Sequence, residues 1–152
     1  MKQTSSRILG IDPGTNILGF AVIEVDGDKV DVLEIGVLHL KDKGEHVDKL
    51  KEIFLEIQEI IERYLPKDLA IEAPFFGKNV QSMLKLGRAQ GVAMAAGMTM
   101  GLSITEYSPK KVKQSVTGNG NASKEQVADM TYRLLSLKPG KLPLDATDAL
   151  SV

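Results

Sequence analysis

Hydrophobic residues in the first forty positions occur in short runs that are separated by turn-forming residues. The runs 7–12, 18–25 and 30–40 are rich in Ile, Leu, Val and Phe, and Pro13-Gly14 and Asp26-Gly27 lie between them. Runs of this kind, bounded by Pro, Gly and Asp, are typical of β-strands. Because the connections are short, the three strands are expected to form an antiparallel meander.

The hydrophobic period changes after residue 45. Between residues 46 and 64, hydrophobic residues recur every three or four positions with Lys and Glu between them, which predicts an amphipathic helix. The remaining predicted elements are strands at 69–72 and 102–107, a helix rich in Ala, Gly and Met at 80–100, and shorter helices at 109–114, at 123–137 and from 143 onward. This order predicts a single mixed α/β domain over residues 1–152.

The composition excludes several classes of protein. The 152 residues are 43% hydrophobic and 26% charged, as in an ordinary globular domain, and they include no cysteine. Disulfide scaffolds and cysteine-based zinc sites are therefore excluded. No hydrophobic run reaches the roughly 18 residues of a membrane span, and the N-terminus lacks the apolar core of a signal peptide. We therefore expect a cytoplasmic protein with no membrane partner.

The near-neutral net charge of −1 conceals an uneven distribution. Residues 1–76 contain 9 Lys and Arg against 15 Asp and Glu, whereas residues 77–152 contain 10 against 5. A basic second half is consistent with a nucleic-acid partner, although two solvated surfaces can also differ in charge by chance.

Four acidic residues occupy positions where an ordinary solvent-exposed side chain is not expected. Asp12 and Glu72 end hydrophobic strands, and Asp145 and Asp148 are spaced to share one face of the last helix. A carboxylate in a buried run is costly unless it is paired or binds a metal. A set of oxygen ligands without His or Cys suits Mg²⁺ or Mn²⁺, and two such ions support in-line displacement at phosphorus.

Each of these acids also has a simpler interpretation. Asp12 precedes Pro13-Gly14 and could be a turn residue, Glu72 could pair with a buried lysine, and Asp145 could cap its helix. The combination of two acids at strand ends with an acidic pair on a helix is uncommon, and it favours the metal-site hypothesis.

Five segments resemble the RuvC-type Holliday junction resolvases, in order and across nearly the whole chain. They are GIDPGT (10–15), AIEAPFFGKN (70–79), LKLGRAQGVA (84–93), YSPKKVKQSVTG (107–118) and DATDAL (145–150). The resemblance implies an α/β fold of the ribonuclease-H-like type, with a five-stranded mixed sheet flanked by helices. It also implies a Mg²⁺-dependent endonuclease, with two ions per active site and Mn²⁺ able to substitute. Such an enzyme resolves four-way DNA junctions by paired symmetric nicks during recombination and DNA repair.

The resemblance also implies roles for individual residues. The family's catalytic, metal-binding acids fall on Asp12, Glu72, Asp145 and Asp148. The aromatic residue that the family inserts at the junction centre falls on Phe75, and its DNA-contacting lysines fall on Lys113 and Lys124. Further candidate DNA contacts, chosen for their charge, are Lys78, Lys85, Arg88, Lys110 and Lys111.

The resemblance further implies partners. The family forms homodimers through the helix that matches residues 80–100, whose small residues would allow close packing. The family also works with a branch-migration motor complex of the RuvA/RuvB type. One feature departs from the family, because its last helix usually runs several residues past the second aspartate. Here the sequence ends at Val152, soon after Asp148, so we expect a short, frayed helix that holds Asp145 and Asp148 loosely.

Three alternatives remain at this stage. Actin-like or sugar-kinase-like ATPases share an Asp-x-Gly-Thr turn, which matches Asp12–Thr15, but they need two lobes, and the sequence has no later Gly-rich adenosine loop. A junction-binding protein with weakened catalysis would keep the fold but not the cleavage. The YqgF-like nucleases, which act on RNA, share the early Asp-x-Gly motif but fit the LKLGRAQG and Lys-rich segments poorly. ATP turnover without DNA, and cleavage of a four-way junction with Mg²⁺, separate the first two alternatives from the resolvase.

Overall fold

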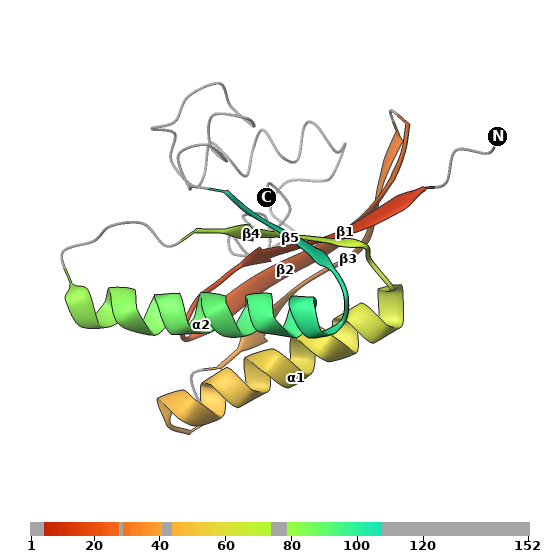
Figure 1. Cartoon of the computed structure of the whole chain (residues 1–152). Coiled ribbons are helices and arrows are strands. Elements are labelled where there is room, and N and C mark those ends of the chain that lie inside the picture. Colours follow the sequence, from red (N-terminus) through yellow and green to blue (C-terminus); the bar gives the residue numbers. More distant parts are fainter. Residues whose placement is uncertain (1–4, 28, 41–43, 74–78, 108–152) are drawn as a thin grey trace.

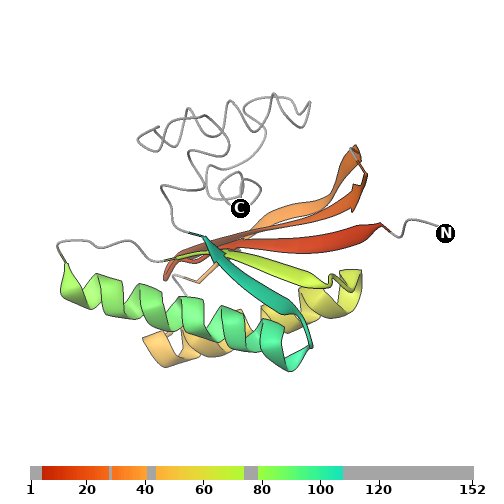
Figure 2. The same cartoon turned by 45° about the horizontal axis from the view of Figure 1, so that its top comes forward.

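A five-stranded mixed sheet with two helices on one face forms the framework of the molecule (Figures 1 and 2). The computed structural model describes residues 5–27, 29–40, 44–73 and 79–107. The strand order is β3-β2-β1-β4-β5, with β1, β2 and β3 antiparallel and with β4 parallel to both β1 and β5. The α/β class and the five-stranded mixed sheet expected from the sequence are confirmed.

The first three strands form the expected meander. They are β1 (Ser6–Asp12), β2 (Ile17–Asp26) and β3 (Lys29–His39), each within one residue of its predicted bounds. Gly27, between β2 and β3, has φ +61°, a left-handed conformation that glycine adopts without strain. At Gly36 an added Cβ would lie 2.8 Å from the Phe20 ring, so glycine on β3 makes room for that aromatic side chain.

Helix α1 (His46–Tyr64) packs on the sheet through its isoleucines, as the sequence period predicted. Its buried residues are Ile53, Ile57, Ile60 and Ile61. The helix ends at Leu65, which has left-handed backbone angles and donates its backbone N–H to the carbonyl of Ile61. Pro66 follows, and a proline soon after a helix end prevents its continuation.

Helix α2 (Val80–Thr99) connects β4 (Asp68–Glu72) to β5 (Ser103–Tyr107) and approaches them closely. At its start, the Asn79 side chain accepts a hydrogen bond of 3.1 Å from the backbone N–H of Ser82. Near its end, a Cβ on Gly97 would lie 2.8 Å from Leu69 Cδ1 and 2.9 Å from Ile104 Cδ1. The small residues of this face therefore set the short distance between the helix and the sheet.

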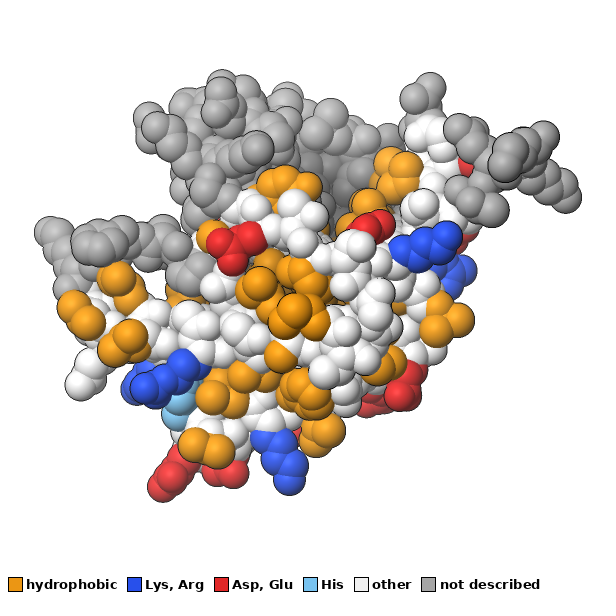
Figure 3. Space-filling view, in the orientation of Figure 1, with side chains coloured by type: hydrophobic (Ala, Val, Ile, Leu, Met, Phe, Trp, Pro, Cys, Tyr) orange, Lys and Arg blue, Asp and Glu red, His pale blue; other side chains and the backbone are white. Residues whose placement is uncertain are grey.

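The outer side of α2 leaves hydrophobic side chains at the surface. Leu84 is 57% exposed and Met98 58% exposed, and Val80 at the start of the helix is also exposed. Figure 3 shows hydrophobic side chains at the surface of this side of the molecule. Among the residues that the structure describes, no helix is long and apolar enough to cross a membrane.

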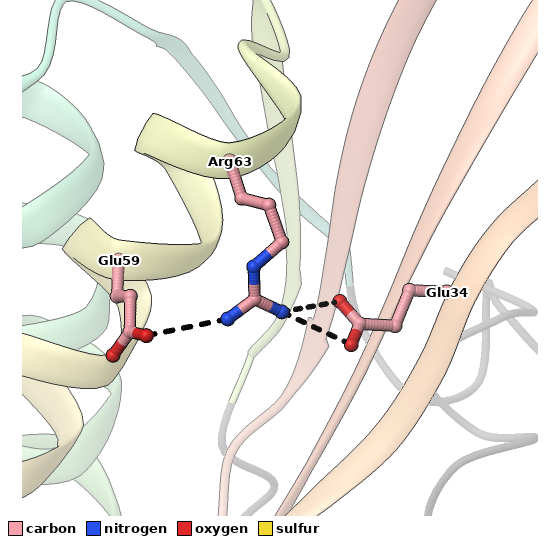
Figure 4. Close-up of polar contacts among 3 residues, drawn as sticks. All are labelled: Glu34, Glu59 and Arg63. Atoms are coloured by element: carbon pink, nitrogen blue, oxygen red, sulfur yellow. Dashed lines mark hydrogen bonds and ion pairs between the residues drawn. The ribbon is translucent and has the colours of Figure 1, made fainter.

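An ion-pair network connects the end of α1 to the edge strand β3 (Figure 4). One guanidinium nitrogen of Arg63 lies 3.2 Å from both carboxylate oxygens of Glu34, and the other lies 3.3 Å from Glu59. The Glu34 carboxylate is the main cause that raises the pKa of Arg63, and smaller effects of Tyr64 and then Glu59 raise it further. Since the Arg63 side chain is 47% exposed, solvent screens these pairs, and we expect each of them to contribute little to stability. The buried core therefore carries most of the stability.

We expect Ile57→Ala to lower the free energy of unfolding by about 2–5 kcal/mol, because Ile57 is completely buried between α1 and the sheet. The control on the same helix is Leu55→Ala, whose side chain is half exposed and should cost about 0.5 kcal/mol. Urea denaturation of the two variants measures the difference. Equal losses would contradict the placement of the core face of α1.

Candidate active site

Asp12 and Glu72 end two neighbouring parallel strands. The register pairs Leu9 with Leu69 and Ile11 with Ile71, so the next residues along β1 and β4 are Asp12 and Glu72. Neighbouring strands lie about 4.8 Å apart, which places the two carboxylate-bearing positions side by side. Both residues are half-buried. The structure thus brings together the two strand-end acids that the sequence predicted for one site.

The two acids occupy the sheet face opposite the helices. Leu9, Ile11, Leu69 and Ile71 are completely buried and belong to the core formed with α1 and α2. Because side chains alternate along a strand, the positions of Asp12 and Glu72 fall on the other face. The hydrophobic face of the sheet therefore packs against the helices, and the opposite face is available for the active site.

The residues around the acids form rows across the sheet. Asp12 pairs with Gly19 on β2 and Glu72 pairs with Tyr107 on β5, so one row reads Gly19, Asp12, Glu72, Tyr107. The preceding row on the same face consists of small residues and a threonine, namely Ala21, Gly10, Ala70 and Thr105. Small side chains there permit a close approach of other groups to this face of the sheet.

The turn after Asp12 is tightly constrained. An added Cβ on Gly14 would lie 2.0 Å from the carbonyl oxygen of Ile17, so no other residue fits without movement of the backbone. The carbonyl oxygen of Asn16 accepts a hydrogen bond of 2.7 Å from the backbone N–H of Leu40. The Asn16 side-chain oxygen accepts one of 3.2 Å from Lys49 Nζ on α1. These contacts fix the end of β1, and with it Asp12.

The end of β4 is held from the other side. The backbone N–H of Ala73 donates to the carbonyl oxygen of Tyr107 over 2.7 Å, which extends the pairing of β4 and β5 past Glu72. Gln90 on α2 is 7% exposed, and its Nε2 donates to Glu106 Oε2 over 2.6 Å. This bond fixes α2 to the end of β5, one residue before Tyr107.

The donor set fits a divalent cation that prefers oxygen. Asp12 and Glu72 supply two neighbouring carboxylates, which are ligands typical of Mg²⁺ and Mn²⁺. Within the described part of the chain, no three acidic or histidine residues group closely enough to form a metal site by themselves. The other two predicted metal ligands, Asp145 and Asp148, lie outside the described residues.

Only two of the predicted DNA contacts lie in the described part of the chain. Lys85 and Arg88 are exposed on α2 and line an open pocket with Gln81 and Leu84. The remaining candidates fall outside the described residues, namely Phe75, Lys78, Lys110, Lys111, Lys113 and Lys124.

Sequence reasoning missed one group of residues near this end of the sheet, in which His46 and Lys49 of α1 lie near Lys85 and Arg88 of α2. His46, at the start of α1, has its pKa lowered by partial burial and then by the positive charges of Arg88, Lys85 and Lys49. The sequence contained no signal for this group, because it is formed by two helices that are far apart along the chain.

Known proteins resemble this chain over most of its length. The family model described as crossover junction endodeoxyribonuclease RuvC matches residues 8–152. A relative with the same description from Bacteroides fragilis is 56% identical, over 95% of this chain and 78% of its own. The relative from Christiangramia forsetii is 59% identical, over 95% of this chain and 75% of its own. The chain thus spans about three quarters of the length of these relatives.

Solved structures agree with the sequence matches. The Thermus thermophilus RuvC structure superimposes with a TM-score of 0.85 at 32% identity, over 96% of this chain and 90% of that one. The same protein in complex with a Holliday junction substrate gives a TM-score of 0.87 at 31% identity. This match covers 97% of this chain and 90% of that one. None of these matches favours the ATPase alternative. The chain belongs to the RuvC family of crossover junction endodeoxyribonucleases.

Proposed function

We propose that this protein resolves four-way DNA junctions by hydrolysing one phosphodiester bond in each of two symmetric strands. The observation that carries the proposal is the register of β1 and β4, which places Asp12 beside Glu72 at the end of the sheet. A RuvC relative of known structure binds a Holliday junction substrate, which supports the same substrate for this chain. Resolution of such junctions is a step of recombination and DNA repair.

The proposed active site consists of four carboxylates. Asp12 and Glu72 would hold the metal from the strand ends, and Asp145 and Asp148 would complete its coordination from the last helix. Two Mg²⁺ ions, or Mn²⁺ in their place, would supply hydroxide from water and stabilise the departing oxygen. The hydrogen bonds at Asn16 and Ala73 hold the two strand ends rigid, so the carboxylates need little reorganisation when the DNA strand binds.

We further propose a homodimer that joins through α2. Exposed Leu84 and Met98 lie on this helix, and a Cβ added to Gly87 or Gly91 would meet nothing within 4 Å. A second backbone could therefore approach this side of the helix closely. A two-fold dimer presents two active sites to two symmetric strands, as paired nicks require.

The DNA surface would surround the active site. Phe75 would stack at the junction centre, and basic side chains would contact the phosphates. The proposed phosphate contacts are Lys78, Lys85, Arg88, Lys110, Lys111, Lys113 and Lys124. We also propose that a branch-migration motor of the RuvA/RuvB type delivers the junction, and that the protein acts in the cytoplasm.

Asp12→Asn should abolish cleavage of a labelled four-way junction while it leaves junction binding largely intact, because the lost carboxylate binds metal rather than DNA. The loss should exceed the roughly 100-fold that is typical of residues outside the first ligand shell. Chelation of divalent metal should stop the wild-type enzyme, and added Mg²⁺ should restore it.

The matched control is Asp68→Asn, which changes an exposed aspartate at the opposite end of β4. It should cleave the junction like the wild type. Wild-type protein that leaves the junction uncut with Mg²⁺ present, or Asp12→Asn protein that still cuts it, would refute the proposed function.

Lys113→Ala should weaken junction binding and lower the slope of log Kd against log salt concentration by about one, because one phosphate contact is lost. Binding titrations over a range of salt concentrations measure the slope. Lys67→Ala, which removes an exposed lysine at the opposite end of β4, should leave it unchanged. A normal slope in Lys113→Ala would remove Lys113 from the proposed contacts.

Phe75→Ala should reduce opening of the junction centre more than affinity for linear duplex, because a base loses a stacking partner worth about 1–3 kcal/mol. The fluorescence of 2-aminopurine at the crossover reports the opening. Phe75→Trp should restore it, since indole also stacks. An equal loss of affinity on junction and duplex would instead identify Phe75 as a core residue.

A further inference from the structure

The starts of the two helices form a basic corner, which we define as His46, Lys49, Lys85 and Arg88. The positive charges of Arg88, Lys85 and Lys49 all lower the pKa of the His46 ring, so cations from both helices lie near it. In Figure 3 a histidine lies beside Lys and Arg side chains at the end of the molecule where both helices begin. Helix α1 has five acidic residues against three Lys and Arg, and its contribution to the basic corner comes from its first turn, where Asp48 lies beside Lys49.

The basic corner lies at the same end of the sheet as the acids. Lys49 Nζ donates to the Asn16 side chain over 3.2 Å, and Asn16 belongs to the turn that directly follows Asp12. Helix α2 starts at Val80, a short distance along the chain from Glu72. A DNA strand that passes the acids is therefore within reach of the helix starts.

The cations of the corner take no part in the ion pairs found among the described residues. Within the described residues, Lys49, Lys85 and Arg88 form no ion pair, although Arg7, Lys29 and Arg63 do. Lys85 and Arg88 lie three residues apart on α2 and point into one open pocket with Gln81 and Leu84. Like charges held close together are destabilising, and an anion in the pocket would relieve the repulsion between Lys85 and Arg88.

The His46 ring adds a second indication of a ligand. Its Nε2 atom is buried and has no hydrogen-bond partner within the described residues. Buried polar atoms are almost always satisfied, so an unpaired one often indicates a group that binds there.

We propose that the basic corner binds backbone phosphates of a DNA arm as it leaves the junction. It would extend the DNA-binding surface from the acid end of the sheet around to the helix side. This inference rests on the proposed junction resolvase function. It adds Lys49 to the contacts, and it joins Lys49, Lys85 and Arg88 into a single site beside His46.

The test measures the affinity of a long-armed four-way junction over a range of salt concentrations. The double variant Lys49→Met/Lys85→Met should lower the slope of log Kd against log salt concentration by about 1.8, since each lost phosphate contact removes about 0.9. The double variant Lys51→Met/Lys67→Met removes the same charge from exposed positions outside the corner and should leave the slope unchanged. Thermal unfolding of both variants confirms that each is folded.

The outcomes separate this inference from the proposed function. A wild-type protein that cuts the junction, together with a normal slope in Lys49→Met/Lys85→Met, would overturn the basic corner and remove Lys85 from the proposed phosphate contacts, but it would leave the resolvase function standing. In that case the basic corner would be solvated or would bind an acidic protein partner. A wild-type protein that neither binds nor cuts the junction would refute the proposed function itself. A reduced slope in the first variant but not in the control supports the DNA contact.

Discussion

The parallel register of β1 and β4 is the constraint on which the active site depends. It brings Asp12 and Glu72, which are sixty residues apart in the sequence, to neighbouring positions on one face of the sheet. A slip of β4 by a single residue would turn its carboxylate toward the helices. The slip would also expose Leu69 and Ile71, which are completely buried, so the hydrophobic core enforces the geometry of the site.

The two faces of the sheet therefore have different functions, one in packing and one in the active site. Helices α1 and α2 cover one face with isoleucine, alanine and glycine, and the close approach at Gly97 and the bond between Gln90 and Glu106 fix α2 to the parallel strands. The opposite face presents small residues beside the acids. Because both helices start at the acid end of the sheet, their first turns can add positive charge to the site without disturbing the core.

Much of this organisation could be predicted from the sequence. Hydrophobic periods located every described strand and helix to within one residue, and the strand-end positions of Asp12 and Glu72 indicated a shared site. Strand order could not be predicted from periodicity, because it depends on pairing between distant segments, and the family resemblance implied only a five-stranded mixed sheet. The basic corner was missed for the same reason, since Lys49 lies in the acidic half of the sequence and joins Lys85 and Arg88 only after folding.

The most direct test of the account is a double-mutant cycle on metal affinity. Mn²⁺ binding would be measured by electron paramagnetic resonance for the wild type, Asp12→Asn, Glu72→Gln and the double variant. If the two carboxylates hold the same ions, each single change removes most of the affinity and the double change adds little, so the losses are far from additive. Additive losses, or single variants that bind Mn²⁺ as the wild type does, would contradict a shared metal site.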